Sequence, residues 1–98
     1  MKILAIEKEL PGTIAEQFQP LLVAEARCVW ELYQAGVLRE LYFRQDCHTA
    51  VLVLECQDVA EARQVLAELP LVANGLIEFE IIPLVAYPGF ERLFAHVG

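Results

Sequence analysis

Basic residues are scarce in this chain of 98 residues. Lys and Arg number 7 against 14 Asp and Glu, which gives a formal net charge of −7. Because nucleic-acid binding draws its affinity from clustered Lys and Arg, we expect no nucleic-acid partner, and an anionic membrane surface is disfavoured for the same reason. No apolar run approaches the roughly 18 residues that cross a bilayer. The run at residues 3–6 is shorter than the apolar segment of a secretory signal.

Cysteine and histidine are scarce too. The three cysteines fit no Cys-x-x-Cys pattern, so we expect reduced thiols and a cytoplasmic location. The two histidines, His48 and His96, lack any metal-ligand spacing, so no metal site is predicted. The chain also has no glycine-rich phosphate loop and no Ser–His–Asp or Cys–His pattern, which leaves nucleophilic catalysis without support.

Hydrophobic residues, by contrast, make up 57% of the chain. Ordinary usage is about 45–50%, and a domain of this size buries only about 60–65% of its unfolded surface. A lone globule of 11.0 kDa cannot hide so much apolar material. We therefore expect part of it to be buried between copies of the chain, in a homodimer or larger homo-oligomer.

Four segments predict β-strands. Residues 3–6 and 50–54 are apolar runs, which suit strands covered on both faces. Residues 37–44 and 76–84 alternate apolar and charged side chains. In the first of these, alternation puts Arg39 on the same face as Leu41 and Phe43. The intervening turn makes a hairpin of the second and third strands.

Two segments predict helices. Thr13 and Glu16 form a capping box that begins the first helix. Pro20 should kink this helix, or start a new one after a short first turn, and Gly36 should end it with a left-handed cap. A second capping box begins the next helix, which Pro70 stops.

The resulting order β-α-β-β-α-β predicts one ferredoxin-like α+β domain over residues 1–98, with a four-stranded antiparallel sheet and two helices on one face. The other face needs cover, because two of the strands are apolar on both sides. The economical solution is the sheet of a second subunit, which gives a dimeric α+β barrel. Residues 86–98 are expected to be a C-terminal docking arm, in which a Pro-Gly turn leads to Phe90, Leu93 and Phe94.

Glu25 is the first candidate for a functional residue. At about 100° per residue along the first helix, it falls near the centre of an apolar stripe. The stripe consists of Phe18, Leu21, Leu22, Val29, Leu32 and Tyr33. A carboxylate there must find a cation, take up a proton or face water in a pocket. An ion pair with Arg39, or rotation to solvent at the Pro20 kink, would be structural, whereas a carboxyl with a raised pKa in an apolar pocket would serve as a general base.

Further candidates lie on the second strand and its hairpin. Arg39 is the lone charge on an apolar strand face and could hold a ligand carboxylate, or pair with an acidic residue at an interface. His48 could serve acid–base chemistry if the hairpin borders the pocket, or be solvated as turn histidines usually are. For substrate binding the candidates are Tyr42, as a hydrogen-bond donor, and Phe18 and Leu22 of the helical stripe.

Four stretches together resemble muconolactone Δ-isomerase. They are residues 33–42 (YQAGVLRELY), 66–72 (LAELPLV), 77–80 (IEFE) and 84–88 (LVAYP). The most specific pieces are the step from Gly36 to Arg39 and the Leu-Pro-Leu helix ending at residues 69–71. The likeness extends over nearly the whole chain. Two features depart from the family: residues 3–6 are wholly apolar, and His48 is displaced by one position.

The resemblance implies a dimeric α+β barrel with a ligand cavity between sheet and helices. It also implies cofactor-free proton transfer on a small unsaturated lactone or related carboxylate. Glu25 would be the base, and Arg39 would stabilise the developing enolate or a substrate carboxylate. Two alternatives are a non-catalytic module for ligand binding or oligomerisation, and a cofactor-independent monooxygenase of the same superfamily, because the fold alone does not choose between chemistries.

Overall fold

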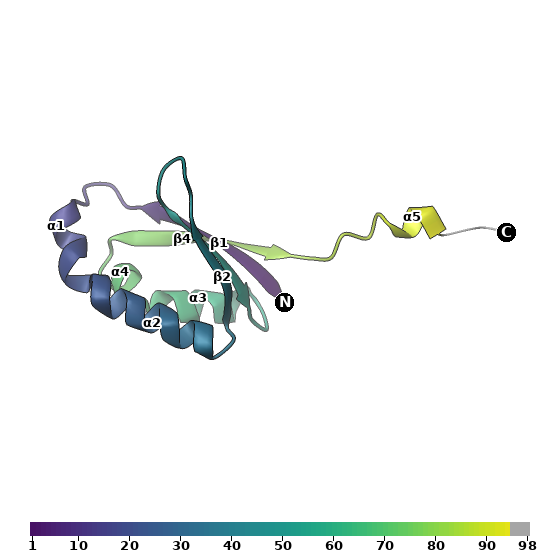
Figure 1. Ribbon diagram of the computed structural model, residues 1–98, viewed down its shortest axis with the longest axis horizontal. Coiled ribbons are helices and arrows are strands. Elements are labelled where there is room, and N and C mark those ends of the chain that lie inside the picture. Colours follow the sequence, from purple (N-terminus) through teal and green to yellow (C-terminus); the bar gives the residue numbers. More distant parts are fainter. Residues whose placement is uncertain (95–98) are drawn as a thin grey trace.

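The computed structural model describes residues 1–94. Its strands form one antiparallel sheet in the order β2-β3-β1-β4, and its helices cover one face of that sheet (Figure 1). The strands are β1 (Lys2–Glu9), β2 (Leu38–Phe43), β3 (Ala50–Glu55) and β4 (Ile77–Leu84). The predicted ferredoxin-like α+β arrangement is confirmed. The end of the predicted arm, residues 95–98, and with it the second histidine lie outside the described residues.

The first predicted helix begins with a different cap from the one expected. It consists of α1 (Ala15–Phe18), the 3₁₀ turn η1 (Gln19–Leu21) and α2 (Leu22–Gln34). The capping box of Thr13 and Glu16 is wrong, because the Thr13 hydroxyl donates to the Leu10 carbonyl. Instead, the Gln17 side chain accepts from the backbone N–H of Ile14 at 2.8 Å. The predicted break at Pro20 is confirmed, since that residue lies in the 3₁₀ turn.

Pro70 begins a helix as well as ending one. After α3 (Val59–Ala67), the short helix α4 (Pro70–Ala73) starts at this residue. Proline suits the first helical position, because its missing N–H would have no intrahelical partner there and its φ is already helical. From the sequence, only the end of a helix is predicted at Pro70.

The core follows from the alternation along β1. Ile3 and Ala5 are fully buried against the helices, whereas Leu4 and Ile6 point to the opposite face and stay partly exposed. The other core members come from neighbouring strands and from the end of α3: Leu38, Leu52, Leu54, Cys56, Ala62, Leu66 and Leu69. No helix within residues 1–94 covers the opposite face of the sheet.

A bulge in β2 changes the predicted faces of this strand. Leu38 pairs with Leu54 and Glu40 with Val53, so Arg39 is the extra residue between two consecutive partners. As a result, Leu38 and Leu41 both face the helices. The prediction that Arg39 shares a face with Leu41 is wrong, because strict alternation does not survive a bulge.

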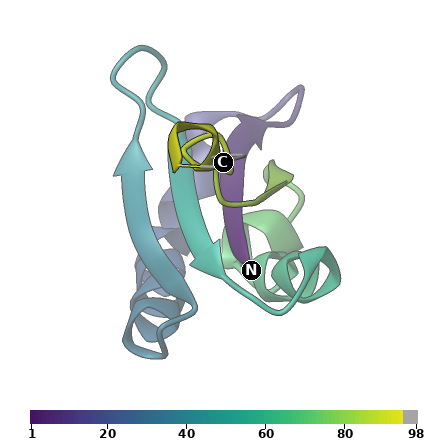
Figure 2. The ribbon, with the colours of Figure 1, turned by 90° about the vertical axis from the view of Figure 1, so that its right-hand side faces the viewer.

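The chain beyond β4 leaves the body of the molecule. Residues 85–94 extend away from the sheet and end in α5 (Glu91–Phe94), and Figure 2 shows this arm projecting toward the viewer. Phe90, Leu93 and Phe94 are exposed by 66, 66 and 73%. They therefore do not pack against the body of their own chain. Within residues 1–94, no helix is long and apolar enough to cross a membrane.

The cap that ends α2 offers a test of the backbone geometry. Gly36 has φ 79°, a left-handed conformation that costs an L-residue with a Cβ about 1–2 kcal/mol. We expect Gly36→Ala to lower the free energy of unfolding by this amount, measured by urea denaturation. Gly36→Asn is the matched control and should cost less, because asparagine tolerates this region better. Equal stability of all three proteins would contradict the left-handed conformation of Gly36.

Candidate functional site

A cavity of about 680 Å³ lies between α2 and the sheet. Its volume falls within the range of about 300–1,000 Å³ typical of small-molecule sites. Most of the lining is apolar or aromatic and comes from α2, β2, β3 and β4; it includes Leu22, Val29, Trp30, Tyr33, Leu41, Phe43, Leu52 and Phe79. Four charged residues complete the lining: Glu7, Glu25, Arg39 and Glu40. The arrangement suits a small, mainly apolar ligand with few polar groups.

Glu25 lies in the first turn of α2 and is half-buried on the cavity wall. Its Oε1 accepts the backbone N–H of Leu71 at 2.9 Å. Leu71 is in the first turn of α4, where backbone N–H groups have no intrahelical acceptor. The carboxylate thus caps a helix distant in sequence and ties α2 to α4. Within residues 1–94, this is its single hydrogen bond.

Burial raises the pKa of Glu25 above its ordinary value of 4.5. The Leu71 N–H opposes this effect by stabilising the charged form, and the negative charge of Glu7 raises the pKa further. The structural alternative of an ion pair with Arg39 is wrong, since within residues 1–94 Glu25 has no cationic nitrogen within 4.0 Å. The group that opposes the effect of burial on the pKa is therefore a backbone N–H, which no pattern of charged residues in the sequence indicates.

Glu7 is a cavity residue that the sequence analysis missed. It is the next residue after Ile3 and Ala5 on the helix-facing side of β1, and its Oε1 accepts the backbone N–H of Ala50 at 3.0 Å. The alternation of β1 could have revealed it, because a carboxylate that continues a fully buried face must lie at the edge of the core. Glu7 is not among the predicted site residues, because the apolar run predicted for this strand ends at Ile6.

Arg39 and Tyr42 border the cavity from the edge strand β2. The Arg39 guanidinium donates through Nε to the Gly36 carbonyl. A hydrogen bond from the Met1 ammonium lowers the pKa of Glu55, and the charge of Arg39 adds a smaller effect in the same direction. Tyr42 pairs with Val51, on the face turned away from the helices. Its hydroxyl donates to Glu40 at 2.9 Å, and this bond raises the pKa of the Tyr42 phenol.

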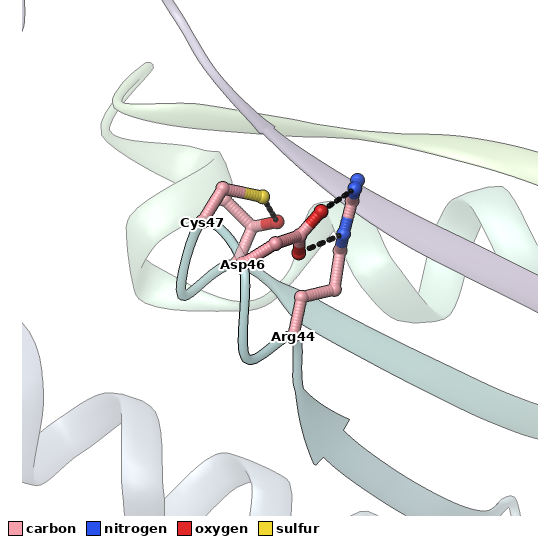
Figure 3. A network of polar contacts seen from close by, with 4 residues as sticks. Arg44, Asp46 and Cys47 are labelled. Atoms are coloured by element: carbon pink, nitrogen blue, oxygen red, sulfur yellow. Dashed lines mark hydrogen bonds and ion pairs between the residues drawn. The ribbon is translucent and has the colours of Figure 1, made fainter.

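His48 lies at the hairpin between β2 and β3 with φ 54°. Its ring stacks on Phe43, with centroids 4.4 Å apart. The hairpin is braced by a bidentate pair in which Arg44 donates to Asp46, and by the contact of the Cys47 thiol with the Thr49 hydroxyl (Figure 3). His48 thus adjoins a cavity residue without lining the cavity itself.

The two apolar candidates on the helical stripe separate. Leu22 lines the cavity. Phe18 lies before the 3₁₀ turn and packs against the second apolar cluster, which contains Leu71, Leu76 and Ile77. The interruption at Pro20 explains the difference, because it breaks the stripe between the two residues. Of the predicted site residues, the structure brings Glu25, Arg39, Tyr42 and Leu22 to one cavity.

The fold and the cavity define a ferredoxin-like α+β protein with room for a small ligand between sheet and helices. The solved structures it is similar to include muconolactone isomerase, with a TM-score of 0.74 and 20% sequence identity over 90% of this chain and 92% of that one. A 5-chloro-2-hydroxyhydroquinone dehydrochlorinase from Burkholderia phenoliruptrix, in complex with 2,5-dihydroxybenzoquinone, gives a TM-score of 0.71 and 15% identity over 91% and 98%. No family model and no curated sequence matches the chain. The likeness to muconolactone isomerase is confirmed for the fold.

The raised pKa of Glu25 predicts a pH-dependent stability. A carboxyl whose folded pKa exceeds its ordinary value of 4.5 costs no stability below that pH, and its cost grows as pH rises from there through the folded pKa. Glu25→Gln keeps an acceptor for the Leu71 N–H and removes the charge. We expect this variant to match the wild type below pH 4.5 and to exceed its melting temperature at pH 7.

The matched control is Glu25→Ala, which removes the acceptor along with the charge. It leaves the Leu71 N–H unpaired, and we expect it to cost about 1–3 kcal/mol at every pH in thermal melts. If Glu25→Gln is less stable than the wild type at pH 7, then the charged carboxylate stabilises the fold and its pKa is not raised.

Proposed function

We propose that the protein catalyses cofactor-free proton transfer on a small unsaturated lactone or a related cyclic carbonyl compound. The observation that carries the proposal is Glu25, a carboxyl with a raised pKa on the wall of a largely apolar cavity. A carboxylate tuned toward neutral pH by burial is what a general base needs. The fold shared with an isomerase and a dehydrochlorinase supports the same class of chemistry.

In the proposed reaction the Glu25 carboxylate takes a proton from a ring carbon beside the carbonyl group. The electrons of the broken C–H bond form a new C=C bond, and negative charge gathers on the carbonyl oxygen. Arg39, the cation among the lining residues, would stabilise this charge. Protonated Glu25 then returns the proton to another carbon of the conjugated system, so the double bond moves and no atom is gained or lost.

The remaining wall would hold the ring. Trp30 and Tyr33 on α2 stack with centroids 5.9 Å apart, and Phe43 and Phe79 line the cavity from the sheet. Flat aromatic surfaces of this kind exclude water and orient a planar ring. His48, stacked on Phe43, would help to hold that ring in place.

A non-catalytic ligand-binding module is the second candidate. The bond from the Leu71 N–H to Glu25 favours it, because it gives the carboxylate a structural reason to be in the wall. In that case the same cavity would hold a ligand without changing it, and Glu25→Gln would leave ligand turnover absent in both proteins.

We also propose that the chain works as a homodimer or larger homo-oligomer. The face of the sheet without helices carries partly exposed apolar side chains, among them Leu4, Ile6, Val51, Val53 and Ile82. The arm adds exposed aromatic rings at Tyr87, Phe90 and Phe94. Apolar surface of this extent is typical of an interface between subunits.

Hydrogen–deuterium exchange tests the proposed chemistry. In D₂O, the wild type should exchange the ring proton beside the carbonyl of an unsaturated γ-lactone, observed by ¹H NMR. Glu25→Gln should slow this exchange by at least about 100-fold, whereas Glu16→Gln, on the exposed side of α1, should not. Exchange at the wild-type rate in Glu25→Gln, or no exchange above the buffer rate in any protein, would contradict the proposal.

Sedimentation tests the proposed assembly. At micromolar concentration the wild type should sediment as a dimer or larger species. Val53→Lys, in the open face of the sheet, and a chain ending at Pro88 should both shift the protein toward the monomer or lower its melting temperature. Gln64→Lys, on the exposed side of α3, adds the same charge as a control. A folded wild-type monomer of 11.0 kDa would rule out the assembly.

A further inference from the structure

The charges that border the cavity are unbalanced. Three carboxylates, those of Glu7, Glu25 and Glu40, line it together with one guanidinium, that of Arg39. Within residues 1–94, neither Glu7 nor Glu25 has a Lys or Arg nitrogen within 4.0 Å. The excess negative charge is therefore not cancelled by direct ion pairs.

Glu7 and Glu25 are each held in place on the cavity wall. Glu7 extends from β1 and is fixed by the Ala50 N–H at 3.0 Å, while Glu25 extends from α2 and is fixed by the Leu71 N–H at 2.9 Å. Each bond joins the carboxylate to an element other than its own. Neither side chain can swing away from the wall without leaving a backbone N–H unpaired.

One cation faces these carboxylates. The Arg39 guanidinium lines the cavity, and its Nε donates to the Gly36 carbonyl at the end of α2. Glu40 is engaged with the Tyr42 hydroxyl on the outer side of β2. A carboxylate ligand in the cavity would therefore face more negative than positive charge, with mostly apolar walls around it that screen charge poorly.

We infer that the cavity selects an uncharged ring, an unsaturated lactone or cyclic ketone without a carboxylate, and that Glu7 is the residue that enforces this choice. The inference rests on the proposed function, since it takes the cavity to be the substrate site. It narrows the substrate class, because like charges at close range oppose binding. A protein that recognises its substrate through a carboxylate would have the opposite preference.

The test compares two ligands and two variants. The ligands are an unsaturated γ-lactone with an acetate side chain and the methyl ester of the same compound. Glu7→Gln keeps an acceptor for the Ala50 N–H while removing the charge. Glu9→Gln changes the net charge equally, and this residue is exposed on the same face of β1, outside the cavity. Affinities would be measured by isothermal titration calorimetry at low ionic strength.

The wild type and Glu9→Gln should bind the ester more tightly than the acid. In Glu7→Gln the affinity for the acid should rise about tenfold while that for the ester stays the same. On the wild type alone, added salt should strengthen binding of the acid and not of the ester, because salt screens the repulsion. This second measurement does not depend on the folding of any variant.

The outcomes distinguish failure of the proposed charge selection from failure of the proposed function. If both ligands bind and Glu7→Gln leaves their ratio unchanged, or if the wild type prefers the acid, the inference is overturned and the proposed function stands. If neither ligand binds to any of the three proteins, the cavity is not the substrate site for this class, and the inference falls together with the proposed function.

Discussion

The alternation of side chains along β1 governs both the core and the cavity. Ile3 and Ala5 are fully buried beneath the helices, and the next residue on that face, Glu7, lines the cavity between α2 and the sheet. The same period of two therefore supplies apolar packing at one end of the strand and a charge at the other. A shift of register by one residue would turn Ile3, Ala5 and Glu7 together to the opposite face of the sheet.

Glu25 connects the two halves of the helical layer. Its carboxylate belongs to α2, yet it satisfies an N–H at the start of α4, so packing and site chemistry depend on one side chain. The bond limits how far burial can raise the pKa, because it favours the charged form. Two effects therefore oppose one another at this carboxyl: burial favours its protonated form, and the backbone bond favours its charged form.

Much of this architecture could be predicted from the sequence, because prolines and apolar periodicity are local features. Glu25 on the apolar stripe was predicted in the same way. The bond from the Leu71 N–H to Glu25 was not predicted. The sequence indicates only that Pro70 ends a helix, whereas the free N–H of the next residue depends on the backbone geometry of α4. The prediction of which β2 side chains share a face was wrong for a related reason. An inserted residue such as Arg39 cannot be recognised from composition and appears only when two strands are paired.

The bulge at Arg39 has a consequence for how this chain meets other chains. β2 and β4 are the outer strands of the sheet, and an outer strand with free N–H and C=O groups can recruit further strands into aggregates. The extra residue in β2 interrupts the regular spacing of those groups. In β4, Pro83 has no backbone N–H to offer, and Glu78 and Glu80 place charged side chains along the strand. Both edges of the sheet thus carry features that disfavour the addition of further strands.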